Sequence, residues 1–447
     1  MKPEKVFKRY DIRGRYPEEV DEVFAERLGK SLGAFVSENY SSKVVVGRDN
    51  KSSSKDLKEA FIHGLASYGV EVVDVGIGPT DYVAYSGKKV ECVSVQVTSS
   101  HMPLEFNGFK FMYPEGNGFL NPDLNRVKEL FRENRVNKAE KATVEERSLK
   151  QDYINSLHKF VERYSLEWEG KNIVLDCLGG STLPFAKQVL EELGCNVYCI
   201  DLEGEDQSLD SFSPYRDPPN PKEEQLEKLM SVVDDKDADL GLSFDLDGDR
   251  VALYHDGSLV SGDKVFAILA GLVSGDVVGS IDTSSGVTRV LDSRNCEFYS
   301  TRVGDPFVMD EAIKKGVELS GEPNGHYSFL DFVPYNSGIL TGVVLAGLDL
   351  DSRIKDLPKF SVLRESIRVD NKQRAMDKVG EFVENDGRVE LLSDLDGFKF
   401  LFDGCSVLAR SSGSSSKIRF MISSTDPDVI LEDIFSELVE MLFLEQV

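Results

Sequence analysis

Apolar positions in the first part of the chain follow two different spacings. Between residues 17 and 37 they recur every three or four positions, as on one face of a helix, at Val20, Val23, Phe24, Leu28, Leu32 and Phe35. Shorter runs rich in β-branched residues predict buried strands. The expected elements are helices at 17–37, 53–68 and 121–134 and strands at 43–46, 71–75 and 92–97. Strands alternating with helices of this length predict a doubly wound, mostly parallel sheet.

The same alternation returns twice after residues 133–150, a charged stretch without apolar periodicity that we interpret as a boundary. The second block has expected strands at 171–176, 195–201 and 238–244, helices at 181–193 and 221–233, and a proline-rich loop at 211–221. The third has expected helices at 264–273, 306–315 and 339–348 and strands at 277–282, 297–301 and 317–320. This recurrence indicates three related α/β domains.

From about residue 360 the pattern changes to short strands joined by tight turns. Strands are expected at 366–369, 389–392, 397–402, 406–410 and 417–423, and helices at 374–384 and 426–444. Strands without intervening helices predict an antiparallel sheet with helices on one face. We therefore expect α/β domains at 1–147, 148–252 and 253–360, and a smaller α+β domain at 361–447.

Length and composition agree with several globular domains. A chain of 447 residues is too long for one core, and 40% hydrophobic and 29% charged residues are ordinary for a folded protein. No apolar run approaches the length of a membrane span, and the N-terminus lacks the apolar core of a signal peptide. Six scattered cysteines, of which only Cys195 and Cys199 are close, predict reduced thiols rather than a zinc site. These features predict a cytoplasmic protein.

A net charge of −26 bears on possible partners. Such a surface repels phosphate polymers, so we expect neither nucleic acid nor an anionic membrane as a partner. A small anionic ligand would need a local cluster of positive groups. The sequence leaves open whether the chain is a monomer or a homodimer.

The first candidate for chemistry is the stretch Val97 to Pro103. It follows the apolar run 92–97 and contains Thr98, Ser99, Ser100 and His101. In α/β sheets ligands bind at the carboxyl ends of strands, so this strand would present a reactive group there. The alternative is that the hydroxyls only cap and turn the chain.

A second candidate is the acidic run Asp245, Asp247 and Asp249, which also follows an expected strand. Residues at spacing two share a face in extended chain, so the three carboxylates can converge on one cation. An EF-hand is excluded because Arg250 stands where its glycine belongs. Carboxylates without histidine or cysteine suit Mg²⁺ or Mn²⁺. A solvated acidic turn is the alternative.

Two further loops could bind a ligand. In Gly321–His326, glycines on both sides let the backbone approach a small molecule, and Glu322 and Asn324 offer hydrogen-bonding groups for hydroxyls. In Arg410–Lys417, one guanidinium, several hydroxyls and the N–H groups around Gly413 could hold a phosphate. A plain Gly-Pro turn and a flexible Ser-rich linker are the respective alternatives.

Together the four loops resemble the α-D-phosphohexomutase superfamily, specifically its phosphomannomutase/phosphoglucomutase branch. The phosphoserine loop of that family, T-A-S-H-N-P followed by N-G-I-K, is matched by 98–103 and 107–110. The metal loop D-G-D-G-D-R is matched by 245–250, the sugar loop G-E-x-S-G-H by 321–326, and the phosphate loop R-x-S-G-T-E-P by 410–416. The opening Y-D-I-R-G at 10–14 is similar to that of phosphomannomutases.

The resemblance implies four domains around a central cleft and a phosphoryl group carried by Ser100. It implies one Mg²⁺ per chain, held by Ser100, Asp245, Asp247 and Asp249. A hexose 1-phosphate and a hexose 6-phosphate, of mannose and/or glucose, would interconvert through hexose 1,6-bisphosphate, which also primes the enzyme. Catalytic roles are implied for Arg13, His101, Lys110 and His326. Substrate contacts are implied for Tyr10, Arg250, Glu322, Asn324, Arg410, Ser412, Gly413, Ser414 and Lys417.

Departures from the family pattern concern recognition more than chemistry. Leu246 and Met102 replace residues that are not ligands, whereas Asn324 replaces a sugar-contacting serine and 414–416 lack the proline of the phosphate loop. Phosphoglucosamine mutase therefore stays as an alternative. A silent sugar-phosphate-binding protein would need neither Ser100 nor the three aspartates, and a haloacid-dehalogenase-like phosphatase would leave Ser100 and the last domain unexplained.

Overall fold

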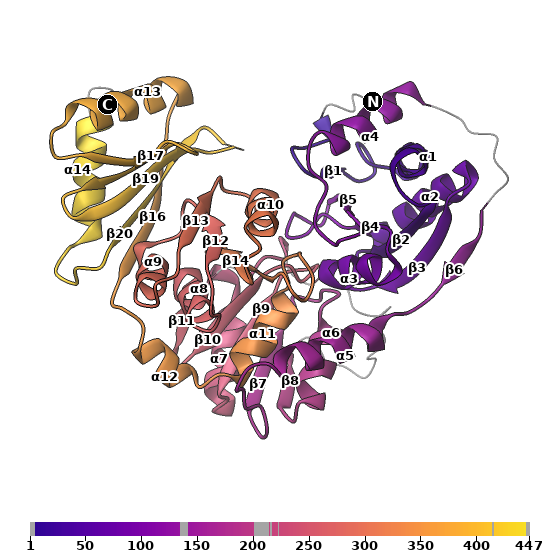
Figure 1. The fold of residues 1–447 in the computed structure, drawn as a ribbon, viewed down its shortest axis with the longest axis horizontal. Helices are drawn as coiled ribbons and strands as arrows, with labels where there is room; N and C mark the ends of the chain where they lie inside the picture. The colour runs from indigo at the N-terminus through magenta and orange to yellow at the C-terminus, as the bar shows by residue number, and fades with distance from the viewer. Residues whose placement is uncertain are drawn as a thin grey trace. The chain divides into compact units, whose positions relative to one another are not determined.

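The computed structural model describes residues 5–134, 142–200, 214, 217–221, 223–413 and 415–443. These residues form two compact parts, which we describe separately (Figure 1). The first part contains the chain up to Val260 together with Gly325–Leu350, and the second part contains Ser261–Asn324 and the chain from Asp351.

The first sheet has the strand order β1-β5-β4-β2-β3-β6. Its strands are β1 (Ile12–Arg15), β2 (Lys43–Arg48), β3 (Glu71–Ile77), β4 (Val93–Val97), β5 (Phe106–Met112) and β6 (Val144–Glu146). Pairing is parallel among β4, β2, β3 and β6 and antiparallel where β5 joins β4 and β1. The sheet is therefore mixed, with an antiparallel edge next to β4.

Helices cover both faces of this sheet. The helices are α1 (Glu22–Asn39), α2 (Ser52–Tyr68), α3 (Thr80–Val90) and α4 (Asp123–Glu133). The apolar faces of α1, α2 and α4 pack together in one aromatic-rich core, where the rings of Phe24 and Phe131 lie 4.8 Å apart. The helix expected from residue 17 begins at Glu22, because Asp21 caps it by accepting a hydrogen bond from the N–H of Phe24 at 2.7 Å.

The second sheet has the order β11-β10-β9-β7-β8, with antiparallel pairing where β10 joins β9 and β11. Its strands are β7 (Asn172–Asp176), β8 (Asn196–Cys199), β9 (Leu240–Phe244), β10 (Val251–His255) and β11 (Ser258–Val260). The associated helices are α5 (Lys150–Val161), α6 (Leu183–Glu192), α7 (Glu227–Lys236) and α11 (Gly338–Gly347). A short 3₁₀ helix, η3 (Glu223–Gln225), precedes α7, and β15 (His326–Phe329) precedes α11.

The stretch 133–150, interpreted as a boundary, contains β6, which pairs with β3, and the first residue of α5. The second sheet continues to Val260, and the expected domain bounds stay a prediction. A further helix start is corrected. The helix expected from residue 221 begins at Glu227. Residues 211–213, 215 and 216 of the proline-rich loop 211–221 lie outside the described residues.

A buried carboxyl group joins three helices of the first part. Asp81, at the start of α3, accepts hydrogen bonds from Tyr153 Oη of α5 at 2.5 Å and from Ser337 Oγ at the N-cap of α11. Its side chain is fully buried, and burial raises its pKa to about 7. The packing of α3, α5 and α11 therefore includes one group whose charge changes near neutral pH.

The second part contains one parallel and one antiparallel sheet. In the parallel sheet, β12 (Val277–Ser280) lies between β13 (Phe298–Thr301) and β14 (Leu319–Glu322), with α8 (Gly262–Ala270), α9 (Ser285–Asp292) and α10 (Asp305–Lys315). A short helix, α12 (Leu350–Lys355), begins at the last residue of the first part. It precedes the antiparallel sheet, which is the fourth sheet of the chain.

The fourth sheet has the order β16-β20-β19-β18-β17 and is antiparallel throughout. Its strands are β16 (Ser361–Arg368), β17 (Glu390–Ser393), β18 (Phe398–Phe402), β19 (Cys405–Ser411) and β20 (Lys417–Ser424). Helices α13 (Lys372–Asn385) and α14 (Leu431–Phe443) lie beside this sheet (Figure 1). Their apolar residues share its core. The predicted fold class, three α/β domains followed by an antiparallel α+β domain, is confirmed. The helix expected from residue 426 begins at Leu431.

No helix in the described ranges is long and apolar enough to cross a membrane. The six cysteines are thiols, as predicted.

Candidate active site

The loop after β4 holds Ser100 in a constrained backbone conformation. Its φ angle is 53°, in the left-handed region that serine seldom adopts, and its N–H donates to Thr98 Oγ1 at 2.9 Å. The side chain is 1% exposed. A strained, buried serine at the end of a central strand is a feature that functional sites often contain.

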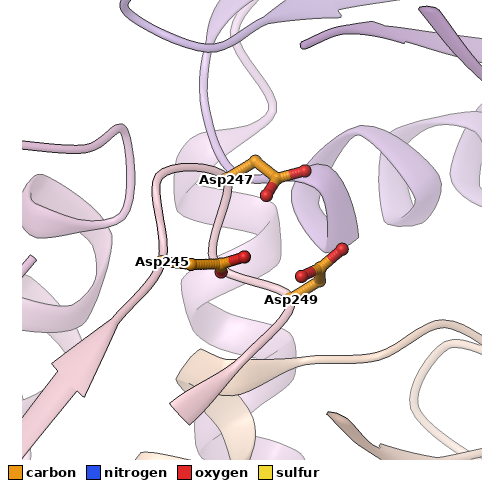
Figure 2. A group of neighbouring side chains, drawn as sticks. All are labelled: Asp245, Asp247 and Asp249. Atoms are coloured by element: carbon orange, nitrogen blue, oxygen red, sulfur yellow. The ribbon is translucent and has the colours of Figure 1, made fainter. Parts of the chain in front are cut away.

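The loop after β9 carries the three aspartates. Gly248 adopts a φ of 72°, and a Cβ there would lie 2.6 Å from Thr182 Oγ1, so this tight turn needs glycine. Figure 2 shows the side chains of Asp245, Asp247 and Asp249 leaving the loop toward a common space. One oxygen of each lies within 4.8 Å of one oxygen of the others, and all three side chains are buried. The predicted convergence of the three carboxylates is confirmed.

These two loops meet. The hydroxyl of Ser100 donates to Asp245 Oδ2 at 3.1 Å, and its oxygen lies 3.2 Å from His101 Nδ1. Burial, followed by the positive charges of Arg250 and Arg13, holds the pKa of His101 well below its usual range. His101 is therefore a neutral imidazole whose Nδ1 lies within hydrogen-bond distance of the serine hydroxyl.

Lys110 of β5 reaches into the acidic loop. Its Nζ donates to Asp247 Oδ2 at 2.7 Å and to Asp249 Oδ2 at 2.6 Å. Burial opposes the ammonium charge, but Asp247 and Asp249 outweigh it and raise the pKa of Lys110 well above its usual range. One lysine thus balances much of the negative charge that the loop collects.

The carboxyls of the loop differ in their affinity for a proton. Burial, with Asp249 and Asp247 adding to it, raises the pKa of Asp245 well above its usual range. Burial also acts on Asp249, but Lys110 and His326 hold the pKa of that carboxyl well below its usual range. Of these two carboxyls, Asp245 is therefore the one that holds a proton more readily.

Two cations and a histidine complete the site. His326, the first residue of β15, has its Nε2 3.2 Å from Asp249 Oδ1 and 3.1 Å from Arg250 Nε. Arg13 of β1 is paired with Asp11 at 2.6 Å. Burial opposes its charge, but Asp11 and then Asp247 raise the pKa of Arg13 above its usual value. Tyr10 lies in the turn before β1 and is half-buried.

The residues fit a hard divalent cation. Asp247 Oδ2 is occupied by Lys110 and by Thr80 Oγ1, the latter at 2.7 Å, whereas its Oδ1 is buried without a hydrogen-bond partner among the described residues. An orphaned carboxylate oxygen beside two further carboxylates is a donor set that suits Mg²⁺.

The remaining predicted residues lie in the second part of the molecule. Glu322 ends β14, is 2% exposed, and accepts from the N–H of Gly304 at 2.9 Å, whereas Asn324 is exposed. Arg410 lies near the end of β19 and is paired with Asp396 at 2.7 Å.

The phosphate loop itself connects β19 to β20. The N–H of Ser412 donates to the carbonyl of Lys417 at 2.9 Å, closing the hairpin. A Cβ on Gly413 would meet nothing within 4 Å, so its backbone is open to a ligand. Ser414 lies outside the described residues.

Sequence reasoning missed two polar residues that touch this site. Thr80 also donates its backbone N–H to the carbonyl of Asp247 at 2.8 Å, and Lys51 Nζ donates to Ser99 Oγ at 2.7 Å. The turn signal Gly78-Pro79 after β3 could have indicated Thr80. Lys51 had no comparable signal, because an isolated lysine before a helix reads as a solvent-exposed residue.

Family models and similar proteins agree with this geometry. Models described as phosphoglucomutase/phosphomannomutase alpha/beta/alpha domains I, II and III match residues 4–138, 151–257 and 261–359. A phosphoglucomutase/phosphomannomutase of Thermococcus kodakarensis is 31% identical over 93% of this chain and 93% of its own length. A phosphoglucosamine mutase of Clostridium acetobutylicum is 30% identical over 93% and 94%.

A solved structure shares the fold. It is a phosphoglucomutase/phosphomannomutase family protein of Burkholderia thailandensis with a TM-score of 0.85, 24% identity and 98% coverage of both chains. With three consecutive domain models matched and a relative aligned over nearly its whole length, the chain belongs to the phosphoglucomutase/phosphomannomutase family of the α-D-phosphohexomutase superfamily, whose members are intramolecular phosphotransferases.

Proposed function

We propose that the chain interconverts the 1-phosphate and 6-phosphate of mannose and/or glucose, with Ser100 as the phosphoryl carrier and hexose 1,6-bisphosphate as the intermediate. The observation that carries the proposal is the placement of Ser100 Oγ, 3.1 Å from Asp245 and 3.2 Å from neutral His101. A purely structural serine needs neither the left-handed backbone nor a carboxylate from a distant loop.

The reaction would proceed in two transfers. A sugar hydroxyl oxygen attacks the phosphorus of phosphorylated Ser100, the bond from phosphorus to Oγ breaks, and a bisphosphorylated hexose forms. After the hexose has turned over, Ser100 Oγ attacks its other phosphate and regains a phosphoryl group. Atoms balance, because each transfer forms one oxygen–phosphorus bond and breaks one.

The surrounding residues suit these transfers. Lys110 and Arg13 are permanently cationic at neutral pH and would balance charge on the transferring group. His101 lies beside Ser100 Oγ and His326 touches Asp249, so both are placed to exchange a proton with the reacting groups. Asp245, Asp247 and Asp249, with an oxygen on Ser100, would hold Mg²⁺. When bound, Mg²⁺ neutralises phosphoryl oxygens and favours attack at phosphorus.

Recognition would come from the remaining loops. Glu322 and Asn324 would hold sugar hydroxyls, and Tyr10 and Arg250 would contact the substrate. The phosphate that is not being transferred would bind Arg410, Ser412, Gly413, Ser414 and Lys417. The open backbone at Gly413 supports this assignment, because phosphate oxygens bind well to exposed N–H groups.

Phosphoglucosamine mutase is a second candidate, favoured by the similarity to an enzyme of that name. Asn324 stands at a position expected to contact the sugar, so it bears on the choice of hexose. The Tyr10–Gly14 opening favours mannose and glucose. We propose a cytoplasmic enzyme acting on small sugar phosphates, as a monomer or homodimer.

A coupled assay tests the proposal. Mannose 1-phosphate, glucose 1-phosphate and glucosamine 1-phosphate would each be supplied with Mg²⁺ and a trace of the corresponding hexose 1,6-bisphosphate. We expect the highest kcat/KM with mannose or glucose. Preference for glucosamine would establish the second candidate, and absence of turnover with all three would refute the proposed function.

A further inference from the structure

The turn formed by Arg302, Val303 and Gly304, between β13 and α10, contacts the sugar loop 321–326 and the turn that precedes β18. The N–H of Gly304 donates to Glu322 Oε1 at 2.9 Å. The preceding N–H, of Val303, donates to Asp396 Oδ2 at 3.3 Å. Two consecutive backbone donors therefore hold carboxylates from two different sheets, one at the end of β14 and one before β18.

Asp396 continues this connection to the phosphate loop. The same oxygen, Oδ2, accepts from Arg410 Nη1 at 2.7 Å. A guanidinium has five N–H donors, so this pairing fixes its direction while other donors stay available for a phosphate. Arg410 is 15% exposed and Asp396 is 32% exposed, so the pair is only partly screened by water.

The turn that carries Asp396 is itself held firmly. Gly397 adopts a φ of 102°, and a Cβ there would lie 2.3 Å from the carbonyl oxygen of Ala409, so β18 and β19 approach closely at this point. Arg302 Nε donates to the carbonyl of Leu395 at 3.2 Å, which adds a second tie between the two turns. Asp396 is therefore well placed to transmit the position of one loop to the other.

The half-buried carboxyl group of Asp282 responds to both Glu322 and Arg410. Burial and then the charge of Glu322 raise the pKa of Asp282, whereas Arg364 and Arg410 lower it. Glu322 and Arg410 thus act electrostatically on the same side chain, so the connection through Val303 and Gly304 joins groups that are already close.

We propose that Asp396 is a positioning residue that couples the phosphate-binding Arg410 to the sugar-binding Glu322 through Val303 and Gly304. The inference rests on the proposed function of those two residues. The sugar and the phosphate of a hexose phosphate would then bind to groups that are connected to each other. Loss of the contact at Glu322 would weaken binding at Arg410, and the reverse.

Replacement of Asp396 tests the coupling. Asp396→Ala removes the acceptor, and Arg410 must then lose rotamer freedom on binding, which raises KM for glucose 1-phosphate by about three- to tenfold. We expect kcat to stay within about twofold, since Asp396 touches no reacting atom. Asp396→Asn keeps an oxygen for Arg410 and Val303 and should restore most of the affinity. Asp394→Ala, an exposed carboxylate of the same turn, is the matched control and should leave KM unchanged.

A double-mutant cycle then measures the connection to Glu322. If the loops are coupled, Asp396→Ala combined with Glu322→Gln raises KM by less than the product of the single effects. A multiplicative result, an unchanged KM in Asp396→Ala, or a lower KM because Asp396 competes with phosphate, would each overturn the coupling. Calorimetric binding of glucose 6-phosphate gives the same comparison without turnover. Failure of the wild-type chain in the coupled assay would instead count against the proposed function.

Discussion

Replacement of Ser99 by alanine should lower stability and leave turnover, whereas replacement of Ser100 should abolish turnover and leave stability nearly unchanged. Ser99 Oγ donates to the carbonyl of Phe106 at 2.8 Å and accepts from Lys51 Nζ at 2.7 Å, inside a fully buried site. Among the residues that the structure describes, Ser100 Oγ makes two long contacts, with Asp245 and His101. One hydroxyl holds the loop together, and the other faces the chemistry.

The contacts of each hydroxyl determine how much its removal should change the free energy of unfolding. Removal of a buried hydroxyl that leaves its partners unsatisfied costs about 1–3 kcal/mol. Because Phe106 keeps a donor in Lys51 Nζ at 3.1 Å, we expect Ser99→Ala to lose about 1 kcal/mol and to retain turnover. Ser100→Ala loses contacts of 3.1 and 3.2 Å, which should change the free energy of unfolding by less than about 1 kcal/mol. It removes the proposed phosphoryl carrier, so turnover should vanish.

Three measurements separate these outcomes. Thermal unfolding compares the stabilities, the coupled assay compares turnover, and intact mass after incubation with glucose 1,6-bisphosphate reports a covalent phosphoryl group. A phosphoryl group that persists in Ser100→Ala, or its loss in Ser99→Ala with the fold intact, would refute the assignment of Ser100.

Three further predictions concern single side chains. Asp247→Asn should weaken Mg²⁺ binding by roughly tenfold or more in calorimetry, since it removes one anionic ligand; unchanged affinity would exclude Asp247 as a ligand. Arg410→Ala should weaken hexose monophosphate binding by roughly 2–3 kcal/mol and release free bisphosphate during turnover, and normal values for both would show that Arg410 does not bind substrate. Because the pKa of Asp81 is raised to about 7, stability from its protonated form is complete below about pH 4 and lost as pH rises through 7. Asp81→Asn should therefore be more stable than the wild type at pH 8 by up to roughly 4 kcal/mol but not at pH 4; a gain independent of pH would contradict this.

Sequence patterns predicted two kinds of element. These are the helices and strands with one apolar and one polar face, and the strands that form long runs of β-branched residues. The strand before Ser100 and the strand before Asp245 are of this kind, and so the reactive loops were placed at strand ends correctly. Helix α3 was missed because most of its residues are buried, which leaves no polar stripe to reveal the helical period. Strand β6 was missed because its three residues are exposed and two of them are charged.

The sequence indicated which residues could form the site, but it did not indicate which of their side chains contact one another. Three aspartates at spacing two indicate convergence, yet nothing in the sequence shows that Lys110 joins Asp247 and Asp249 across more than a hundred positions. The same holds for Thr80 and Asp247, and for Asp396 and Arg410. Such contacts depend on how β5, β3 and β18 are placed in their sheets, which local spacing does not contain.

The ion pairs of Lys110 also bear on how the protein matures in the cell. A loop of three buried carboxylates without a compensating cation would oppose folding, and the chain would then depend on metal to complete its fold. Because Lys110 already supplies a cation to two of the three, this loop has a compensating charge without any metal ion. If the loop binds Mg²⁺ as proposed, loading would be a late and reversible event, set by the free Mg²⁺ concentration rather than by protein synthesis.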